Sequence, residues 1–145
     1  MHTASAKIWK ARLAAGLLLL APLPVLASPS AEIAAAVQAK LDEALAEQKV
    51  FLSCLATTEK DGDVTETSWR QEFEGAIAIM RDAGFDAAMI DGFAAQAEPA
   101  ALMLNEVPLG EVIAFCRSQE DWLNKRYRLQ YVILPLALPK IIGGG

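Results

Sequence analysis

Apolar residues recur at helical spacing along most of the chain after residue 28. The first such stretch places six of them on one helix face: Ile33, Val37, Leu41, Leu45, Leu52 and Leu55. Ser28 or Ser30 can cap this helix, and Pro29 suits its first turn. The pattern predicts one long helix that ends around Thr57, and it allows a kink near Lys49.

Residues 58–67 are polar and predict a connection between two helices. The Asp-Gly-Asp at 61–63 shares alternating oxygen ligands with calcium loops, but the closing glutamate is not at the required spacing, so we interpret it as a turn. Ser68 and Gln71 fit a capping box that begins a second helix. The apolar face of that helix consists of Trp69, Phe73, Ile77 and Met80.

The end of the second helix and the start of a third are marked by local signals. Gly84 fits the left-handed position after a helix, and Phe85 can then pack back on Met80. Asp86 is a cap for a shorter third helix. Its expected buried face is Met89, Ile90, Phe93 and Ala97. Pro99 begins a new turn or short helix that runs through Leu104.

The pattern from Pro108 onward predicts a long last helix that ends at Pro135. Its characteristic residues are Val112, Phe115, Cys116, Trp122, Leu123, Leu129 and Ile133. The chain has no alternating strand pattern of convincing length and no internal repeat. We therefore expect an all-α bundle of four to five helices in a domain that covers residues 28–134.

Residues 1–27 have the form of a secretory signal. Basic residues precede an apolar run, and small residues lead to a cleavage site after Ala27. The alternative is a retained membrane anchor, but the run is shorter than a membrane-spanning helix and contains Pro22 and Pro24. We expect cleavage and a periplasmic or secreted protein.

Cys54 and Cys116 are the only cysteines. In an exported chain, two thiols are expected to oxidise to a disulfide. A loop of this length, about 62 residues, gives on the order of 4 kcal/mol of stabilisation in the chain-entropy model. The alternative is a redox-active or metal-binding pair, yet the chain has no C-x-x-C motif and no histidine placed to complete a metal site.

Charge and histidine content narrow the function classes. Three of the 13 basic residues precede the cleavage site, so the mature chain carries ten against 18 acidic residues, a formal charge of −8 that argues against nucleic acid. The only histidine, His2, is lost with the signal, which removes histidine-based nucleophilic catalysis. Glu72 and Glu74 diverge on a helix and do not form a catalytic pair. We expect that the protein is not an enzyme and that it binds no metal and no cofactor.

Residues 131–142 are mostly apolar and include two prolines, and three glycines follow them. We expect residues 135–145 to form an extended tail that covers the core. The alternative is an exposed strip that, with the preceding basic cluster, binds a partner protein or an anionic lipid surface. The residues of this candidate interaction patch are Lys125, Arg126, Arg128, Tyr131, Leu134, Leu136 and Leu138.

The order of helix, cysteine, helix, Gly84-Phe85-Asp86 step, helix, cysteine and helix resembles small exported bacterial helical proteins with a single disulfide. It is also similar in layout to periplasmic acid-stress chaperones of the HdeA type. That resemblance implies acid-triggered loosening that exposes apolar surface to client proteins. The separation of the two cysteines is wider than in those chaperones. We expect a non-enzymatic periplasmic protein-binding module, with a lipid-binding module as the alternative.

Overall fold

The computed structural model describes residues 28–55, 59–119 and 133–144, with only the backbone described for 59–63. In chain order its helices are α1 (Ala31–Leu55), α2 (Glu59–Asp82), α3 (Ala87–Ala97), α4 (Pro99–Leu102), α5 (Leu109–Ser118) and α7 (Leu134–Ile142). The described residues contain no strand. The all-α prediction is therefore confirmed for them, although their six helices exceed the predicted four to five.

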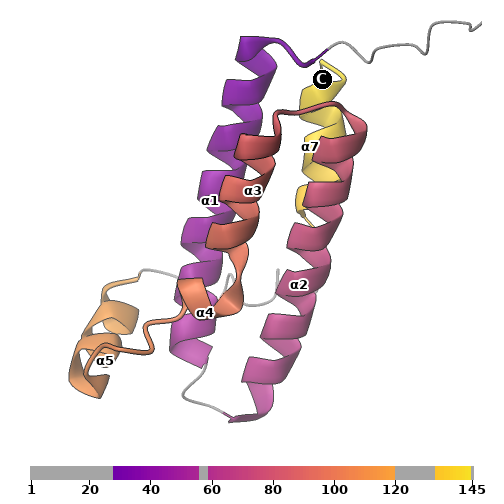
Figure 1. Ribbon diagram of the computed structural model, residues 1–145. Helices are drawn as coiled ribbons and strands as arrows, with labels where there is room; N and C mark the ends of the chain where they lie inside the picture. Colours follow the sequence, from indigo (N-terminus) through magenta and orange to yellow (C-terminus); the bar gives the residue numbers. More distant parts are fainter. Residues whose placement is uncertain (1–27, 56–58, 120–132, 145) are drawn as a thin grey trace, which may run out of the picture.

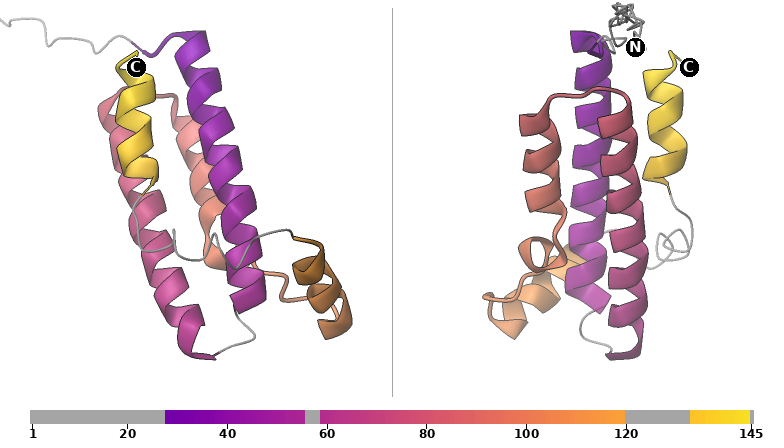
Figure 2. Two further views of the ribbon diagram at one scale, coloured as in Figure 1. Left: turned by 180° about the vertical axis from the view of Figure 1, so that it is seen from behind. Right: turned by 45° about the vertical axis from the view of Figure 1, so that its right-hand side comes forward.

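The two long helices, α1 and α2, form the centre of the bundle (Figure 1). α3 packs against both helices on one side, and α7 packs against both on the opposite side (Figure 2). α4 follows α3 and contacts α1. α5 projects from one end of the bundle, where it packs against α1.

α1 forms as the apolar spacing predicts, in one continuous helix of 25 residues that runs through Lys49. The Ser30 hydroxyl accepts a hydrogen bond from the Ile33 N–H at 3.3 Å, which satisfies one of the N–H groups that a helix start leaves free. Val37 and Leu41 are completely buried. The predicted face is thus the face that enters the core.

α2 begins nine residues earlier than predicted, so the polar connection at 58–67 and the capping box at Ser68 are both wrong. The helix starts at Glu59 and includes the Asp-Gly-Asp at 61–63. One turn before Trp69, the side chain of Thr65 is only 3% exposed. The buried face therefore continues into the polar segment, and tertiary burial outweighs the low helix propensity of aspartate and glycine.

The turn between α2 and α3 confirms the local signals. Gly84 has a φ of 74°, which is a conformation that glycine adopts without strain. The Phe85 N–H donates to the Met80 carbonyl at 3.0 Å, and the Gly84 N–H donates to the Arg81 carbonyl at 3.1 Å. This pair of bonds is the Schellman arrangement. Asp86 then caps α3 by accepting from the N–H groups two and three residues later, at 2.8 and 3.4 Å.

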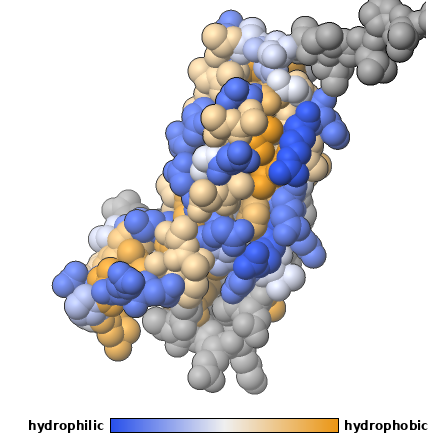
Figure 3. Space-filling model, in the orientation of Figure 1, coloured by the Kyte–Doolittle hydropathy of each residue, from blue (hydrophilic) through white to orange (hydrophobic). Residues whose placement is uncertain are grey.

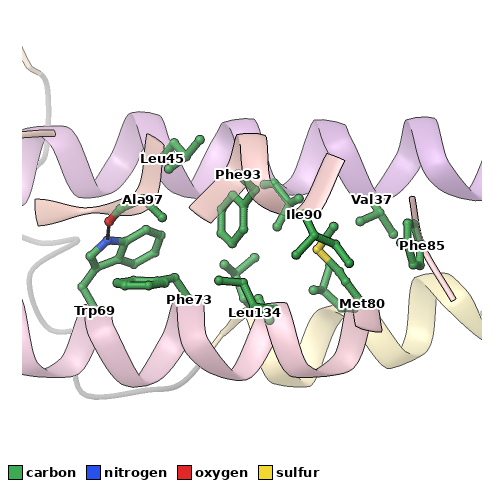
Figure 4. Close-up of a cluster of buried hydrophobic side chains, with 14 of the residues drawn as sticks. Val37, Leu45, Trp69, Phe73, Met80, Phe85, Ile90, Phe93, Ala97 and Leu134 are labelled. Carbon is green, nitrogen blue, oxygen red and sulfur yellow. Dashed lines mark hydrogen bonds between the residues drawn. The ribbon is translucent and has the colours of Figure 1, made fainter. Parts of the chain in front are cut away.

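Side chains from α1, α2, α3 and α7 meet in one hydrophobic core (Figure 4). Trp69 is buried in it, and its indole Nε1 donates to the Ala97 carbonyl oxygen at 2.6 Å. Phe73 lies beside the indole, with the ring centroids 5.7 Å apart. The hydrogen bond satisfies the polar group of the indole and fixes the end of α3 against α2.

The C-terminal segment is helical, so the prediction of an extended tail is wrong. Pro135 does not end a helix but lies in the first turn of α7, where the N–H that proline lacks would have no partner within the helix. Leu134 and Leu138, four residues apart, are both completely buried. α7 is therefore part of the bundle and covers the core, as the first of the two interpretations expected.

The predicted disulfide is present and joins α1 to α5. Cys54 and Cys116 are bonded, with their Cα atoms 5.7 Å apart. The long helix predicted from Pro108 to Pro135 is interrupted, because α5 ends at Ser118 and Gln119 has an extended backbone. Residues 120–132, which the prediction included in that helix, lie outside the described residues.

Candidate interaction surface

α5 carries large apolar side chains that the bundle does not cover. Leu109 is 65% exposed and Ile113, one turn later, is 40% exposed, whereas Val112 between them is buried. In the space-filling view α5 projects at the lower left and carries hydrophobic surface beside hydrophilic residues (Figure 3). One side of α5 therefore packs on the molecule while another presents leucine and isoleucine to solvent.

A groove of about 230 Å³ adjoins this exposed side. Its walls come from the end of α1, the segment between α4 and α5, and the start of α5. They consist of Ser53, Met103, Leu104, Asn105, Val107, Leu109 and Val112. The Ser53 hydroxyl accepts a hydrogen bond from the Leu104 N–H at 3.3 Å, which holds the connecting segment against α1. We name Ile113 together with the groove residues the α5 surface.

The charges beside the α5 surface are mainly acidic. Glu106 precedes α5, Glu111 lies in its first turn, and both are exposed. Arg117 in the last turn is the basic residue of α5. A largely apolar groove whose lining residues are flanked in the sequence by two exposed carboxylates favours a ligand that combines apolar and basic groups.

The structure does not bring the seven residues of the predicted interaction patch together on a described surface. Lys125, Arg126, Arg128 and Tyr131 lie outside the described residues. Leu134 and Leu138 are completely buried in the core, while Leu136, between them, is 66% exposed. Of the three leucines, only Leu136 is available to a partner in this conformation. No sequence signal had drawn attention to Leu109 and Ile113, although their spacing of four residues places them on one side of α5.

Glu72 and Glu74 diverge on α2, as their spacing of two residues predicts. Glu74 is exposed and Glu72 is buried, so the two point in different directions. Glu43 forms an ion pair with Lys40 at 2.9 Å on the exposed side of α1. The side chains of Asp61 and Asp63 lie outside the described residues.

Glu72 is a buried carboxylate on α2. Its Oε1 accepts a hydrogen bond from the Leu134 N–H at the start of α7, at 3.0 Å. Burial raises the pKa of the Glu72 carboxyl above its ordinary value of 4.5, and the Glu47 carboxylate adds to the rise, while the N–H groups of Leu134 and Ile133 and the Lys40 ammonium oppose it. The helical periodicity indicated that Glu72 is buried, since position 72 lies three residues after Trp69 on the buried side of α2.

The described residues contain no group of three or more histidine, cysteine, aspartate or glutamate side chains arranged to hold a metal ion. Among the described helices, none has both the length and the apolar character needed to cross a membrane.

Comparisons with models of protein families, with curated proteins and with solved structures found no match. The structure shows a small all-helical protein with one disulfide, between Cys54 and Cys116.

Proposed function

We propose that this chain is an exported, non-enzymatic module that binds another protein through the α5 surface. The observation that carries the proposal is the exposure of Leu109 and Ile113 beside a groove on a helix anchored by a disulfide. Large apolar side chains that cluster next to a groove are typical of interaction sites, whereas single exposed leucines are ordinary. Leu136 on α7 is an example of the ordinary case.

The acidic residues beside the groove favour a protein partner over an anionic lipid surface. Glu106 and Glu111 would be repelled by lipid phosphates at the distance of a bound helix. A protein segment with an apolar side chain for the groove and a lysine or arginine beside it would satisfy both features. The disulfide supports such a site because it fixes α5 before binding, so less ordering remains to oppose association.

The test uses the purified mature chain and two variants, each of which replaces exposed apolar residues with serine. One carries Leu109→Ser and Ile113→Ser, and the other carries Leu136→Ser, at a leucine with almost the same exposure, 66% against 65%. Each is incubated with periplasmic extract and cross-linked, and the recovered partners are identified and then bound in purified form. We expect the double variant to lose affinity by at least tenfold, because central apolar contacts dominate binding energy, and Leu136→Ser to bind like wild type.

Two outcomes would contradict the proposal. If Leu136→Ser weakens binding and the double variant does not, the contact lies on α7. If the wild-type chain sediments with anionic liposomes at low salt and captures no protein, the lipid-binding alternative is favoured instead.

A further inference from the structure

A small cavity lies where α1, α2 and the start of α7 meet, away from the α5 surface. It is lined by Lys40, Ala44, Glu47, Gln48, Phe51, Glu72 and Ile133, and we name it the Gln48–Glu72 cavity. Its volume is about 10 Å³, which suits about one water molecule.

Gln48 is a polar residue with an unsatisfied group at this cavity. It is 94% buried, since 6% of its surface is exposed, and its Oε1 has no hydrogen-bond partner among the described residues. A buried amide oxygen without a donor has lost its hydrogen bonds to water without replacement, which opposes folding. Groups of this kind in folded proteins are nearly always satisfied by a protein donor or by an ordered water.

The cavity lining also includes a buried carboxylate. Glu72 is 7% exposed, and its Oε1 accepts from the Leu134 N–H at 3.0 Å. The Lys40 ammonium, which is also part of the wall, lies 2.9 Å from Glu43 Oε2. The lining therefore holds the unsatisfied Gln48 amide oxygen together with further acceptors, the carboxylates of Glu72 and Glu47, and a guest that satisfies Gln48 has to donate a hydrogen bond.

We propose that the Gln48–Glu72 cavity binds one internal water molecule, which donates one hydrogen to Gln48 Oε1 and the other to the Glu72 carboxylate. A water has the required size and two donors, and a buried water needs two to four polar partners. Through Glu72 and the Leu134 N–H, this water joins α1 to α2 and to the start of α7. It is a structural ligand of the bundle and does not depend on the proposed function.

The experiment counts long-lived water molecules in the mature chain by oxygen-17 magnetic relaxation dispersion. Wild type is compared with Gln48→Met, which removes the unsatisfied oxygen at similar volume. Gln38→Met is the control, because it is the same change on the same helix at a side chain whose hydrogen bond to Asp42 is exposed. We expect the dispersion amplitude of Gln48→Met to fall by the equivalent of one water, and that of Gln38→Met to remain at the wild-type value.

An unchanged amplitude in a folded Gln48→Met variant would overturn the proposal. A high-resolution crystal structure of the wild-type chain gives a second test that does not need a variant to fold. Density for one water between Gln48 and Glu72 is the expected result. A direct hydrogen bond between the two side chains, or a sodium ion in the cavity, would refute the water site.

Discussion

At the scale of single residues, Gly75 sets how closely α7 can approach α2. A Cβ atom at this position would lie 2.8 Å from Cγ of Pro135, which is closer than two carbon atoms tolerate. The proline ring is rigid, and its position is fixed by the buried leucines on either side of the first turn of α7. Any side chain at residue 75 therefore has to displace α7.

We predict that Gly75→Ala destabilises the protein by about 1 to 3 kcal/mol, the usual cost of overpacking. The control is Gly92→Ala in α3, where an added Cβ meets nothing within 4 Å. That change should stabilise the protein by about 0.5 to 1 kcal/mol, since alanine is the better helix former. Urea unfolding measures both effects. Equal stabilisation by the two substitutions would show that α7 does not contact Gly75 as described.

Glu72 is predicted to make stability depend on pH in the direction opposite to that of a salt-bridged carboxylate. Its pKa is raised in the folded state, chiefly by burial, so the folded chain holds this proton to a higher pH than the unfolded chain does. The contribution of this proton to the free energy of unfolding is fully present below the ordinary pKa of 4.5 and is lost as pH rises through the raised pKa.

Glu72→Gln keeps an oxygen that can accept from the Leu134 N–H but cannot ionise. We expect the variant to gain stability relative to wild type as pH rises, with the difference close to zero at low pH. Free energies of unfolding measured between about pH 4 and pH 8 test this dependence. Glu74→Gln, at the exposed position two residues on, controls for the loss of one charge. A difference that falls with rising pH would contradict the assignment.

At the scale of elements, α7 shows how one residue type can support two predictions. Pro135 was interpreted as the end of a long helix, because proline cannot continue one. Proline is equally suited to the first turn of a helix, and only the burial of Leu134 and Leu138 distinguishes the two cases. That burial depends on α1 and α2, which lie far away in the sequence, so local pattern alone could not decide.

Two leucines of α7 allow the packing of this helix to be tested directly. Leu138→Ala removes a completely buried side chain and should cost about 2 to 5 kcal/mol. Leu136→Ala, two residues earlier and 66% exposed, should change stability by less than about 0.5 kcal/mol. Thermal unfolding of both variants provides the measurement. If the two alanine variants are equally stable, the segment is an exposed strip and not a core helix.

At the scale of the whole molecule, the sequence predicted most accurately the features that depend on interactions between residues close in the chain. The Gly84 stop, the Asp86 cap and the apolar faces of α1 and α3 each depend on neighbours within about one helical turn. The start of α2 and the groove beside α5 depend on packing between distant segments, and the sequence did not reveal them. The disulfide is the long-range contact that could be predicted, because the prediction rested on the expected export of the chain and not on its fold.

The disulfide should also decide whether α5 stays folded. α5 has ten residues, too few for a stable isolated helix, and it packs against α1 at one end of the bundle.

Replacing both cysteines, as Cys54→Ala with Cys116→Ala, removes the closed loop and should cost on the order of 4 kcal/mol of global stability. Hydrogen exchange should then show α5 amides losing protection by at least tenfold more than those of α2 and α3, because α5 can unfold locally while the core persists. Reduced wild type should behave in the same way, which separates loss of the bond from loss of the cysteine side chains. Uniform loss of protection across α2, α3 and α5 would mean that the bridge stabilises the whole bundle and gives α5 no special dependence on it.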